Sequence, residues 1–202
     1  MLEKGFVYLD EALPGVFWDS KYFGSDNFMG RRADGYRVNC IVLTEQAALA
    51  LGRALERARE RNLSFFVFDA YRPARAVADF CAWARDEGDT ARKAIHYPNI
   101  TKPQLIAEGY IAPKSGHSRG SAIDLTLCDE SGDCLDMGGI FDYMDPRSWH
   151  GNKDITAAQA ENRDLLREIM LGSGFKDYLR EWWHYSLKDE PYPDRYFDFA
   201  IE

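Results

Sequence analysis

Apolar residues recur every three or four positions in several segments of the chain, which is the period of an amphipathic helix. One such stripe follows Thr44, whose side chain stands where it can cap the first turn of a helix. Another short segment has Pro103 two residues after Thr101, a spacing typical of a capped helix start. The predicted helices cover residues 44–62, 74–87 and 156–171, and a short helix capped by Thr101 is predicted within "PNITKPQLIAEGY".

Five further segments have the composition of strands, and most of them are rich in β-branched and aromatic residues. Two of them flank the turn "DESGD" and predict a hairpin made of residues 121–128 and 134–139. The other predicted strands are residues 36–43, 63–71 and 178–187. Strands and helices are mixed without a strict βαβ alternation, and the chain has no repeat or linker. We therefore expect one α+β domain over residues 1–202, with a mainly antiparallel sheet flanked by helices.

Charge and composition narrow the partners that this domain could bind. The net charge is -8, from 33 acidic and 25 basic residues, and there is no basic block. Nucleic acids and anionic membranes are therefore not expected as partners, whereas a small zwitterionic substrate fits. No segment is apolar enough to cross a membrane, and the N-terminus lacks the pattern of a signal peptide, so a cytoplasmic protein is expected. The sequence is compatible with a homo-oligomer, because aromatic segments such as "YPDRYFDF" can pack either in the core or at an interface between subunits.

The four cysteines show no CxxC spacing. Cys128 and Cys134 flank the predicted hairpin turn and could face each other across it. In a reducing compartment we expect free and mostly buried thiols rather than a disulfide or a zinc knuckle.

The segment "SGHSRGSAIDLTL" places a histidine in a loop and an aspartate inside an apolar strand. His117 and Asp124 could be two ligands of one metal, or a loop histidine and a hydrogen-bonded turn aspartate. Their odd separation requires a turn before they can meet, and Gly120 is placed to provide it. The spacing alone favours the second, structural alternative.

A second segment, "EWWHY", offers the remaining groups of a metal site. His184 would be the third ligand of a zinc ion in a cleft on the sheet, with a water in the open fourth position. Glu181 would then be a general base for that water. The two residues are three positions apart, an odd separation that would put them on opposite faces of a regular strand, so Glu181 must lie at a bend or bulge at the strand's entrance for both to serve one centre. His96 and His150, the other two histidines, are expected at the surface or in loops.

Arg72 lies between an apolar strand and a predicted helix, in "FDAYRP". A guanidinium held at this edge could stabilise the oxyanion of a tetrahedral intermediate. It could equally form a salt bridge with Asp69, and the segment by itself favours that alternative.

Taken together, these motifs resemble the D-alanyl-D-alanine dipeptidases of the VanX type, zinc enzymes of the lysostaphin, D-Ala-D-Ala and sonic hedgehog metallopeptidase group (peptidase family M15). "SGHSRGSAIDLTL" is similar to the SxHxxGxAxD signature and "EWWHY" to the ExxWH signature of that family. "FDAYRPARAV", "GGIFDYMD" and "DEPYPDRYFDF" follow in the same order, so the resemblance covers nearly the whole chain. Because two long signatures match in the family's order, a metal site is favoured over the alternative of a loop histidine and a hydrogen-bonded turn aspartate.

The resemblance implies zinc-dependent hydrolysis of the free dipeptide D-Ala-D-Ala, either in glycopeptide resistance or in recycling of cell-wall dipeptide. A D,D-carboxypeptidase acting on peptidoglycan peptides, or a non-catalytic zinc-binding module, are the alternatives. The family's roles fall on matching positions of this chain: zinc ligands at His117, Asp124 and His184, a base at Glu181, a transition-state arginine at Arg72, ammonium recognition by Asp142 and Tyr22, the substrate carboxylate near Ser115, and a methyl pocket at Phe80. Gly116 and Trp149 depart from the family's expected residues at the loop and rim, but not at the metal or the base.

Overall fold

The computed structural model describes residues 2–202, which fold around a five-stranded sheet. The strand order is β2-β4-β5-β7-β6. β2 runs parallel to β4, and the other neighbours are antiparallel, so the expected α+β fold with a mainly antiparallel sheet is confirmed. The strands are β2 (Phe17–Trp18), β4 (Ser64–Asp69), β5 (Ala122–Cys128), β6 (Phe175–Tyr178) and β7 (Glu181–Leu187). A separate antiparallel pair joins β1 (Phe6–Tyr8) to β3 (Val42–Thr44).

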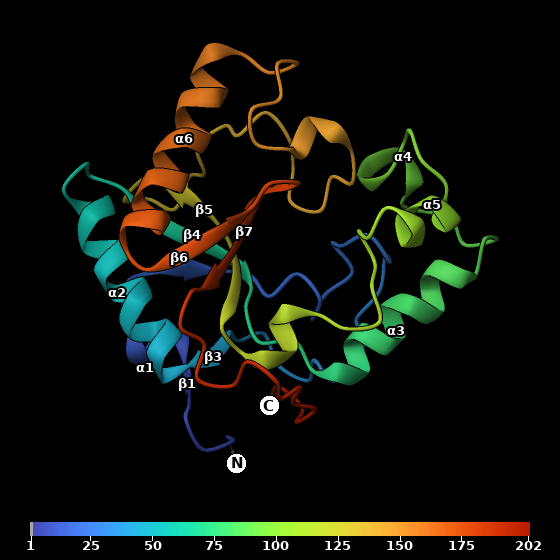
Figure 1. The fold of residues 1–202 in the computed structure, drawn as a ribbon, viewed down its shortest axis with the longest axis horizontal. Coiled ribbons are helices and arrows are strands. Elements are labelled where there is room, and N and C mark those ends of the chain that lie inside the picture. Colours follow the sequence, from blue (N-terminus) through green and yellow to red (C-terminus); the bar gives the residue numbers. More distant parts are fainter. Residues whose placement is uncertain (1) are drawn as a thin grey trace.

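Helices lie on two sides of this sheet (Figure 1). α2 (Glu45–Arg59) and α6 (Ala157–Gly172) pack together and against the sheet on one side. α3 (Ala74–Arg85), α4 (Lys93–His96) and α5 (Lys102–Ala107) lie together on the other side. The short α1 (Leu9–Ala12) follows β1 directly. Within residues 2–202, no helix combines the length and the apolar character that crossing a bilayer requires.

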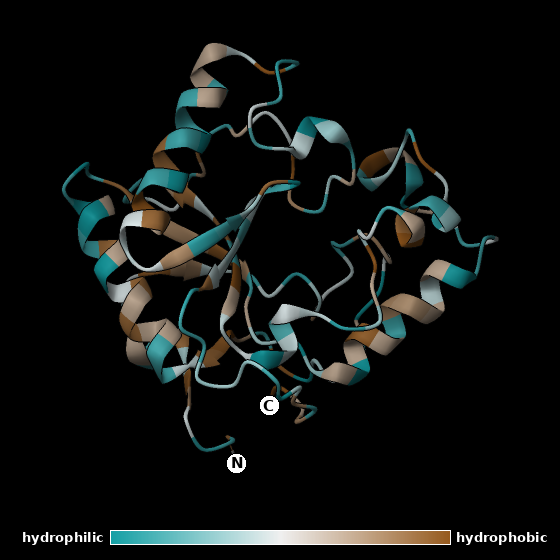
Figure 2. Cartoon of the chain, viewed as in Figure 1, coloured by the Kyte–Doolittle hydropathy of each residue, from teal (hydrophilic) through white to brown (hydrophobic). Residues whose placement is uncertain are grey.

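The predicted helices are confirmed, and side-chain caps explain where three of them begin. Thr44 accepts a hydrogen bond from the Ala47 amide, and Thr156 forms a capping box with Gln159. Thr101 and Gln104 form the same box at the start of α5. Apolar residues of the strands and of the inner helix faces, brown in Figure 2, meet in one core. Every residue of β5 is buried, and that includes Asp124.

Three strand predictions need correction. The segment 36–43 is mostly irregular: only Val42–Thr44 is a strand, because Tyr36 instead pairs with Ile201 and donates its hydroxyl to Asp69. The predicted hairpin reduces to a single bridge between Cys128 and Cys134, since β5 pairs with β4 and β7. Residues 178–180 end β6 and turn into β7, so the last predicted strand begins three residues too early and its hairpin partner was missed.

All four thiols are free in the described residues. Cys81 and Cys128 are buried, Cys40 is partly exposed and Cys134 is exposed, so the expectation of mostly buried thiols holds for only half of them.

Candidate metal centre and catalytic pocket

A tight turn before β5 brings His117 next to Asp124. Ser115 accepts a hydrogen bond from the His117 amide at 3.2 Å and so caps the 3-10 helix Gly116–Arg119. Gly120 then reverses the chain with a φ of 80°, and its amide donates to the His117 carbonyl at 2.9 Å. A left-handed φ is readily adopted by glycine, so the turn expected at Gly120 is confirmed.

β7 supplies His184 and Glu181 to the same pocket. His184 lies opposite Asp124 in the register between β5 and β7. Glu181 is the first residue of β7, and the pairing with β6 shifts register beside it, between Asp177 and Tyr178. A bulge of this kind changes the direction in which neighbouring side chains point. The predicted irregularity at the strand's entrance is therefore confirmed, and both side chains line one pocket.

His117, Asp124 and His184 converge on one point, with their ligand atoms all within 4.8 Å of one another. His184 Nδ1 lies 3.0 Å from Asp124 Oδ1 and 3.1 Å from His117 Nε2. His117 Nε2 lies 3.3 Å from Asp124 Oδ2. Two imidazoles and a carboxylate are a donor set that divalent metals of the zinc type prefer.

The hydrogen bonding around His117 fits a metal at this point. Its Nδ1 lies 2.7 Å from the Ala70 carbonyl, which can only accept, so Nδ1 carries the proton. Nε2 of the neutral ring then presents a lone pair to the Asp124 carboxylate, and burial lowers the pKa of His117, which disfavours a second proton there. A cation between the two groups would satisfy both lone pairs. Histidine ligands of metals are commonly oriented by such a bond from the other ring nitrogen.

The pKa of Asp124, in this cluster, and that of Glu181, beside it, are shifted in opposite directions. Burial works to raise the pKa of Asp124, but the facing rings of His117 and His184 hold that pKa well below its usual range. Burial raises the pKa of Glu181 to about 7, and the positive groups nearby offset only part of this effect. Asp124 is therefore a permanent carboxylate, whereas Glu181 can exchange a proton near neutral pH.

Arg72 forms the salt bridge with Asp69 that its sequence offered as one alternative, and its role toward an oxyanion stays a prediction. Its guanidinium bonds Asp69 through Nε at 3.0 Å and Nη2 at 2.9 Å, and Nη2 also lies 3.4 Å from Asp124. The same group lies against the rings of Tyr22 and Phe80, at 4.8 and 5.1 Å from their centres. The salt bridge to Asp69 thus fixes a guanidinium that also lines the pocket.

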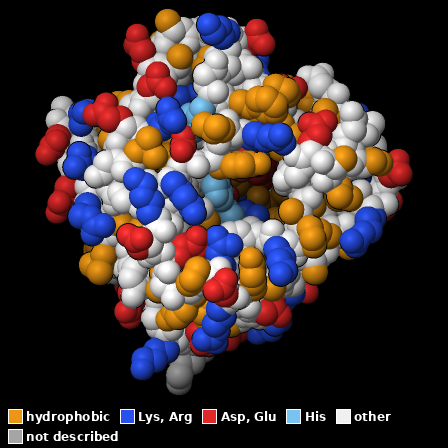
Figure 3. Space-filling view, in the orientation of Figure 1, with side chains coloured by type: hydrophobic (Ala, Val, Ile, Leu, Met, Phe, Trp, Pro, Cys, Tyr) orange, Lys and Arg blue, Asp and Glu red, His pale blue; other side chains and the backbone are white. Residues whose placement is uncertain are grey.

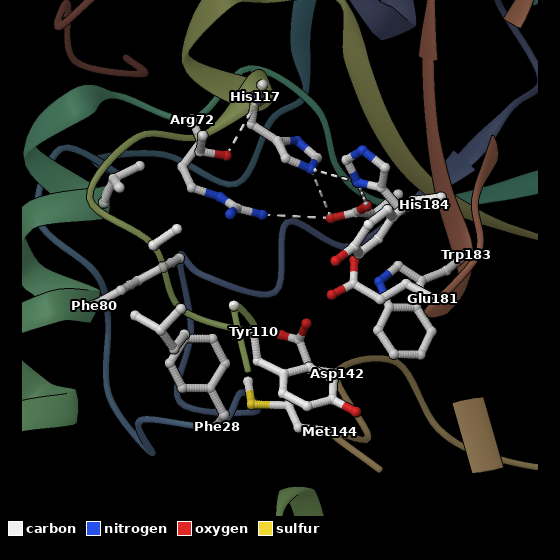
Figure 4. A pocket seen from close by; sticks show the side chains of 18 of the residues that line it. Phe28, Arg72, Phe80, Tyr110, His117, Asp142, Met144, Glu181, Trp183 and His184 are labelled. Atoms are coloured by element: carbon white, nitrogen blue, oxygen red, sulfur yellow. Dashed lines mark hydrogen bonds and ion pairs between the residues drawn. The ribbon is translucent and has the colours of Figure 1, made fainter. Parts of the chain in front are cut away.

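The pocket is a cavity of about 340 Å³, large enough for a small molecule. Figure 3 shows it as a hollow in the surface, with histidine side chains at its edge. The close-up in Figure 4 places Arg72, His117 and His184 at one end and Asp142 and Met144 at the other.

Asp142 and Tyr22 form the polar part of that other end. The Tyr22 hydroxyl donates to Asp142 Oδ2 at 2.8 Å, and both side chains are buried. Burial raises the pKa of Asp142 well above its usual range, and the charge of Asp124 adds to the effect. A buried carboxyl with a single side-chain hydrogen bond is suited to a cationic partner, which would restore its ionised form.

The structure also places the two remaining predicted residues at the pocket wall. Phe80 packs on Tyr22 and Phe28 with ring centres 4.8 and 4.9 Å apart, and Ser115 lies in the loop above. Sequence reasoning missed part of the lining, because it comes from irregular segments that have no periodic signal. These missed residues include Tyr110, Ile111, Lys114 and Met144.

The remaining histidines lie outside this pocket lining. His96 is 3% exposed and belongs to α4, so the prediction of a surface or loop residue is wrong for it. His150 is partly exposed and follows the short 3-10 helix Pro146–Ser148, in agreement with a loop position. Trp149, one of the two departures from the family pattern, donates its indole N–H to Tyr110 at the pocket rim, at 3.1 Å.

Comparison with known proteins matches the whole described chain to one family. The M15 peptidase family described as D-ala-D-ala dipeptidase matches residues 2–202. The D-alanyl-D-alanine dipeptidase of Enterococcus faecalis is 50% identical over 201 residues, covering 99% of this chain and 100% of the relative. That of Streptomyces coelicolor is 48% identical, covering 97% and 98% respectively. Among solved structures, a vancomycin-resistance D,D-pentapeptidase, VanY, is similar over 76% of this chain and 77% of its own, with 17% identity and a TM-score of 0.47.

Proposed function

Because this chain belongs to the D-Ala-D-Ala dipeptidase family of M15 peptidases, we propose that it hydrolyses free D-alanyl-D-alanine to two molecules of D-alanine. The observation that carries this proposal is the convergence of His117, Asp124 and His184 in one cavity with Glu181. Three ligands and a separate carboxyl with a pKa of about 7 are the parts of a hydrolytic metal site rather than of a structural one.

Zinc is the proposed metal, held by His117 Nε2, His184 Nδ1 and the Asp124 carboxylate. When bound, zinc supplies Lewis acidity, which polarises the peptide carbonyl and activates the attacking water. The Ala70 carbonyl keeps the His117 ring in the tautomer that offers Nε2, and Ser186 lies 3.2 Å from the other nitrogen of His184.

Glu181 is the proposed general base. In its ionised form it takes a proton from the water that attacks the peptide carbonyl, and it then delivers that proton to the leaving amine. Arg72, fixed by Asp69, presents its guanidinium to the oxyanion that forms at the carbonyl oxygen. The peptide C–N bond breaks, and the elements of water are shared between the two D-alanine products.

Recognition of a free dipeptide is proposed to depend on the two ends of the cavity. Asp142, oriented by Tyr22, would bind the substrate ammonium, because the positive charge of that group would stabilise the buried carboxylate. Ser115 would lie near the substrate carboxylate, and Phe80 would contact a D-alanine methyl group. An N-acylated peptide would leave Asp142 without a partner, and an unpaired buried polar group weakens binding strongly. This argument favours a dipeptidase over a D,D-carboxypeptidase.

The substitution Glu181→Ala tests the proposed chemistry and the alternative of a non-catalytic zinc-binding module. We expect one zinc per chain in both proteins, and release of D-alanine from D-Ala-D-Ala by the wild type alone. Equal turnover by the variant would overturn the role of Glu181, and zinc without turnover in the wild type would favour the binding module.

A cytoplasmic location remains a prediction, which fractionation of the producing cells would check.

A further inference from the structure

His96 is a buried histidine that the proposed chemistry does not use. It is 3% exposed at the end of α4 and does not itself line the cavity. Its ring nevertheless connects to the cavity, because Nδ1 lies 3.2 Å from the backbone carbonyl of Asp142. The His96 carbonyl also accepts the Met144 amide at 2.7 Å. Two hydrogen bonds therefore fasten the segment 142–144 to one residue of α4.

The partners of the His96 ring fix its tautomer. The Asp142 carbonyl can only accept, so Nδ1 donates. On the other side, Nη2 of Arg92 lies 3.4 Å from Nε2, and a guanidinium can only donate, so Nε2 accepts. Arg92 is itself held by Asp26 at 3.0 Å and by the Asn27 carbonyl at 3.1 Å. Burial lowers the pKa of His96, and the charge of Arg92 adds to this effect, so the ring is neutral at neutral pH.

Asp142 needs such support because of its backbone conformation. Its φ is 57°, a left-handed value that only Asn62 shares among the described residues other than glycine. This conformation costs an aspartate free energy, and it persists where surrounding contacts determine it. The side chain has its bond from Tyr22, and the backbone carbonyl has its bond from His96. Tyr22 and Asn27 belong to the same loop, so one network holds Asp142 from both ends.

We propose that His96 is a positioning residue for ammonium recognition: through its Nδ1–H bond to the Asp142 carbonyl, it orients the Asp142 carboxylate toward the free amino group of the substrate. The inference rests on the proposed function, in which Asp142 binds that ammonium. His96 contributes to the selection of free dipeptides and does not take part in bond cleavage.

Kinetics of His96→Ala and His96→Asn test this role. Asparagine can place an N–H donor close to the position of Nδ1, whereas alanine removes the donor. The substrates are D-Ala-D-Ala and its neutral analogue D-lactyl-D-alanine, in which a hydroxyl group replaces the ammonium. His150→Ala is the matched control, because that histidine lies outside the network. Zinc content and Tm are measured for each protein.

We expect His96→Ala to raise KM for D-Ala-D-Ala about tenfold, the effect of one hydrogen bond, with kcat within about threefold of the wild type. Selectivity for D-Ala-D-Ala over the neutral analogue should fall about tenfold, and His96→Asn should recover most of it. His150→Ala should change neither value. A His96→Ala protein with lower Tm but unchanged KM and selectivity would overturn the proposal, as would an asparagine variant no better than alanine.

A further variant separates this proposal from the proposed function. Asp142→Asn removes the charge itself and should raise KM for D-Ala-D-Ala more than His96→Ala does. If the wild type does not cleave D-Ala-D-Ala, or if Asp142→Asn leaves KM unchanged, the proposed function or its ammonium site is wrong. If Asp142→Asn behaves as expected and His96→Ala does not, only the role of His96 is wrong.

Discussion

Replacing Gly120 with alanine would add a methyl group inside the turn that joins the first two proposed metal ligands. Gly120 has a φ of 80°, and a Cβ built on it would contact the ring of Phe6, with Cζ at 2.6 Å, and Thr44 Cγ2 at 3.1 Å. The Phe6 ring cannot easily move away, because aromatic rings surround it, among them Phe197 and Phe199 at 4.9 and 5.1 Å between centres.

Two costs add up for this substitution. A left-handed conformation costs an L-residue about 1–2 kcal/mol. Overpacking in a close-packed region costs a further 1–3 kcal/mol, approximately. The free energy of unfolding should therefore fall by about 2–5 kcal/mol, which in a domain of this size lowers Tm by roughly 4–20 °C. Because the turn carries His117, zinc affinity should also decrease.

Gly151→Ala provides the control for this prediction. Gly151 has a similar φ of 74°, but a Cβ there would meet nothing within 4 Å, so only the conformational cost applies. In thermal unfolding of the two metal-free variants, the Tm of Gly120→Ala should be about 2–12 °C lower than that of Gly151→Ala. This difference corresponds to the cost of overpacking, because both variants have the conformational cost. Equal Tm values for the two variants would refute the reasoning that the Phe6 contact makes Gly120 necessary.

Three further predictions concern activity. Burial raises the pKa of Glu181 and the base acts when ionised, so kcat/KM for D-Ala-D-Ala should fall as the pH decreases through the pKa of this carboxyl, and a flat acid limb would contradict this. Arg72→Lys keeps the charge but loses the paired bonds to Asp69, so kcat should fall about 10²–10³-fold with zinc retained, measured by D-alanine release and metal content. Removal of the metal by a chelator should abolish turnover and lower Tm, and zinc should restore both; full activity after verified removal would exclude the zinc mechanism.

Local features of the sequence predicted much of this fold. Thr44, Thr101 and Thr156 mark helix starts because their caps use residues three positions away. The turn at Gly120 was also predictable, since the odd spacing of the two ligands required it. These interactions join residues that are close together in the chain, so they leave a pattern that can be recognised in a single sequence.

Long-range pairing explains what could not be predicted. The β-branched run before Thr44 has strand propensity, but Tyr36 instead bonds Asp69 and pairs with Ile201. The buried ring of His96 bonds the Asp142 carbonyl, which lies 46 residues away in the chain. Likewise, the bond between Tyr22 and Asp142 spans 120 residues, so only the resemblance to a family could bring these two residues together in advance.

Release of D-alanine from two substrates tests the central proposal most directly. The purified, zinc-loaded protein is incubated with D-Ala-D-Ala and, separately, with an N-acylated tripeptide ending in D-Ala-D-Ala. Since Asp142 would bind the free ammonium, we predict rapid release from the dipeptide and little from the acylated peptide. Rapid cleavage of the acylated peptide alone would contradict the dipeptidase and favour a D,D-carboxypeptidase.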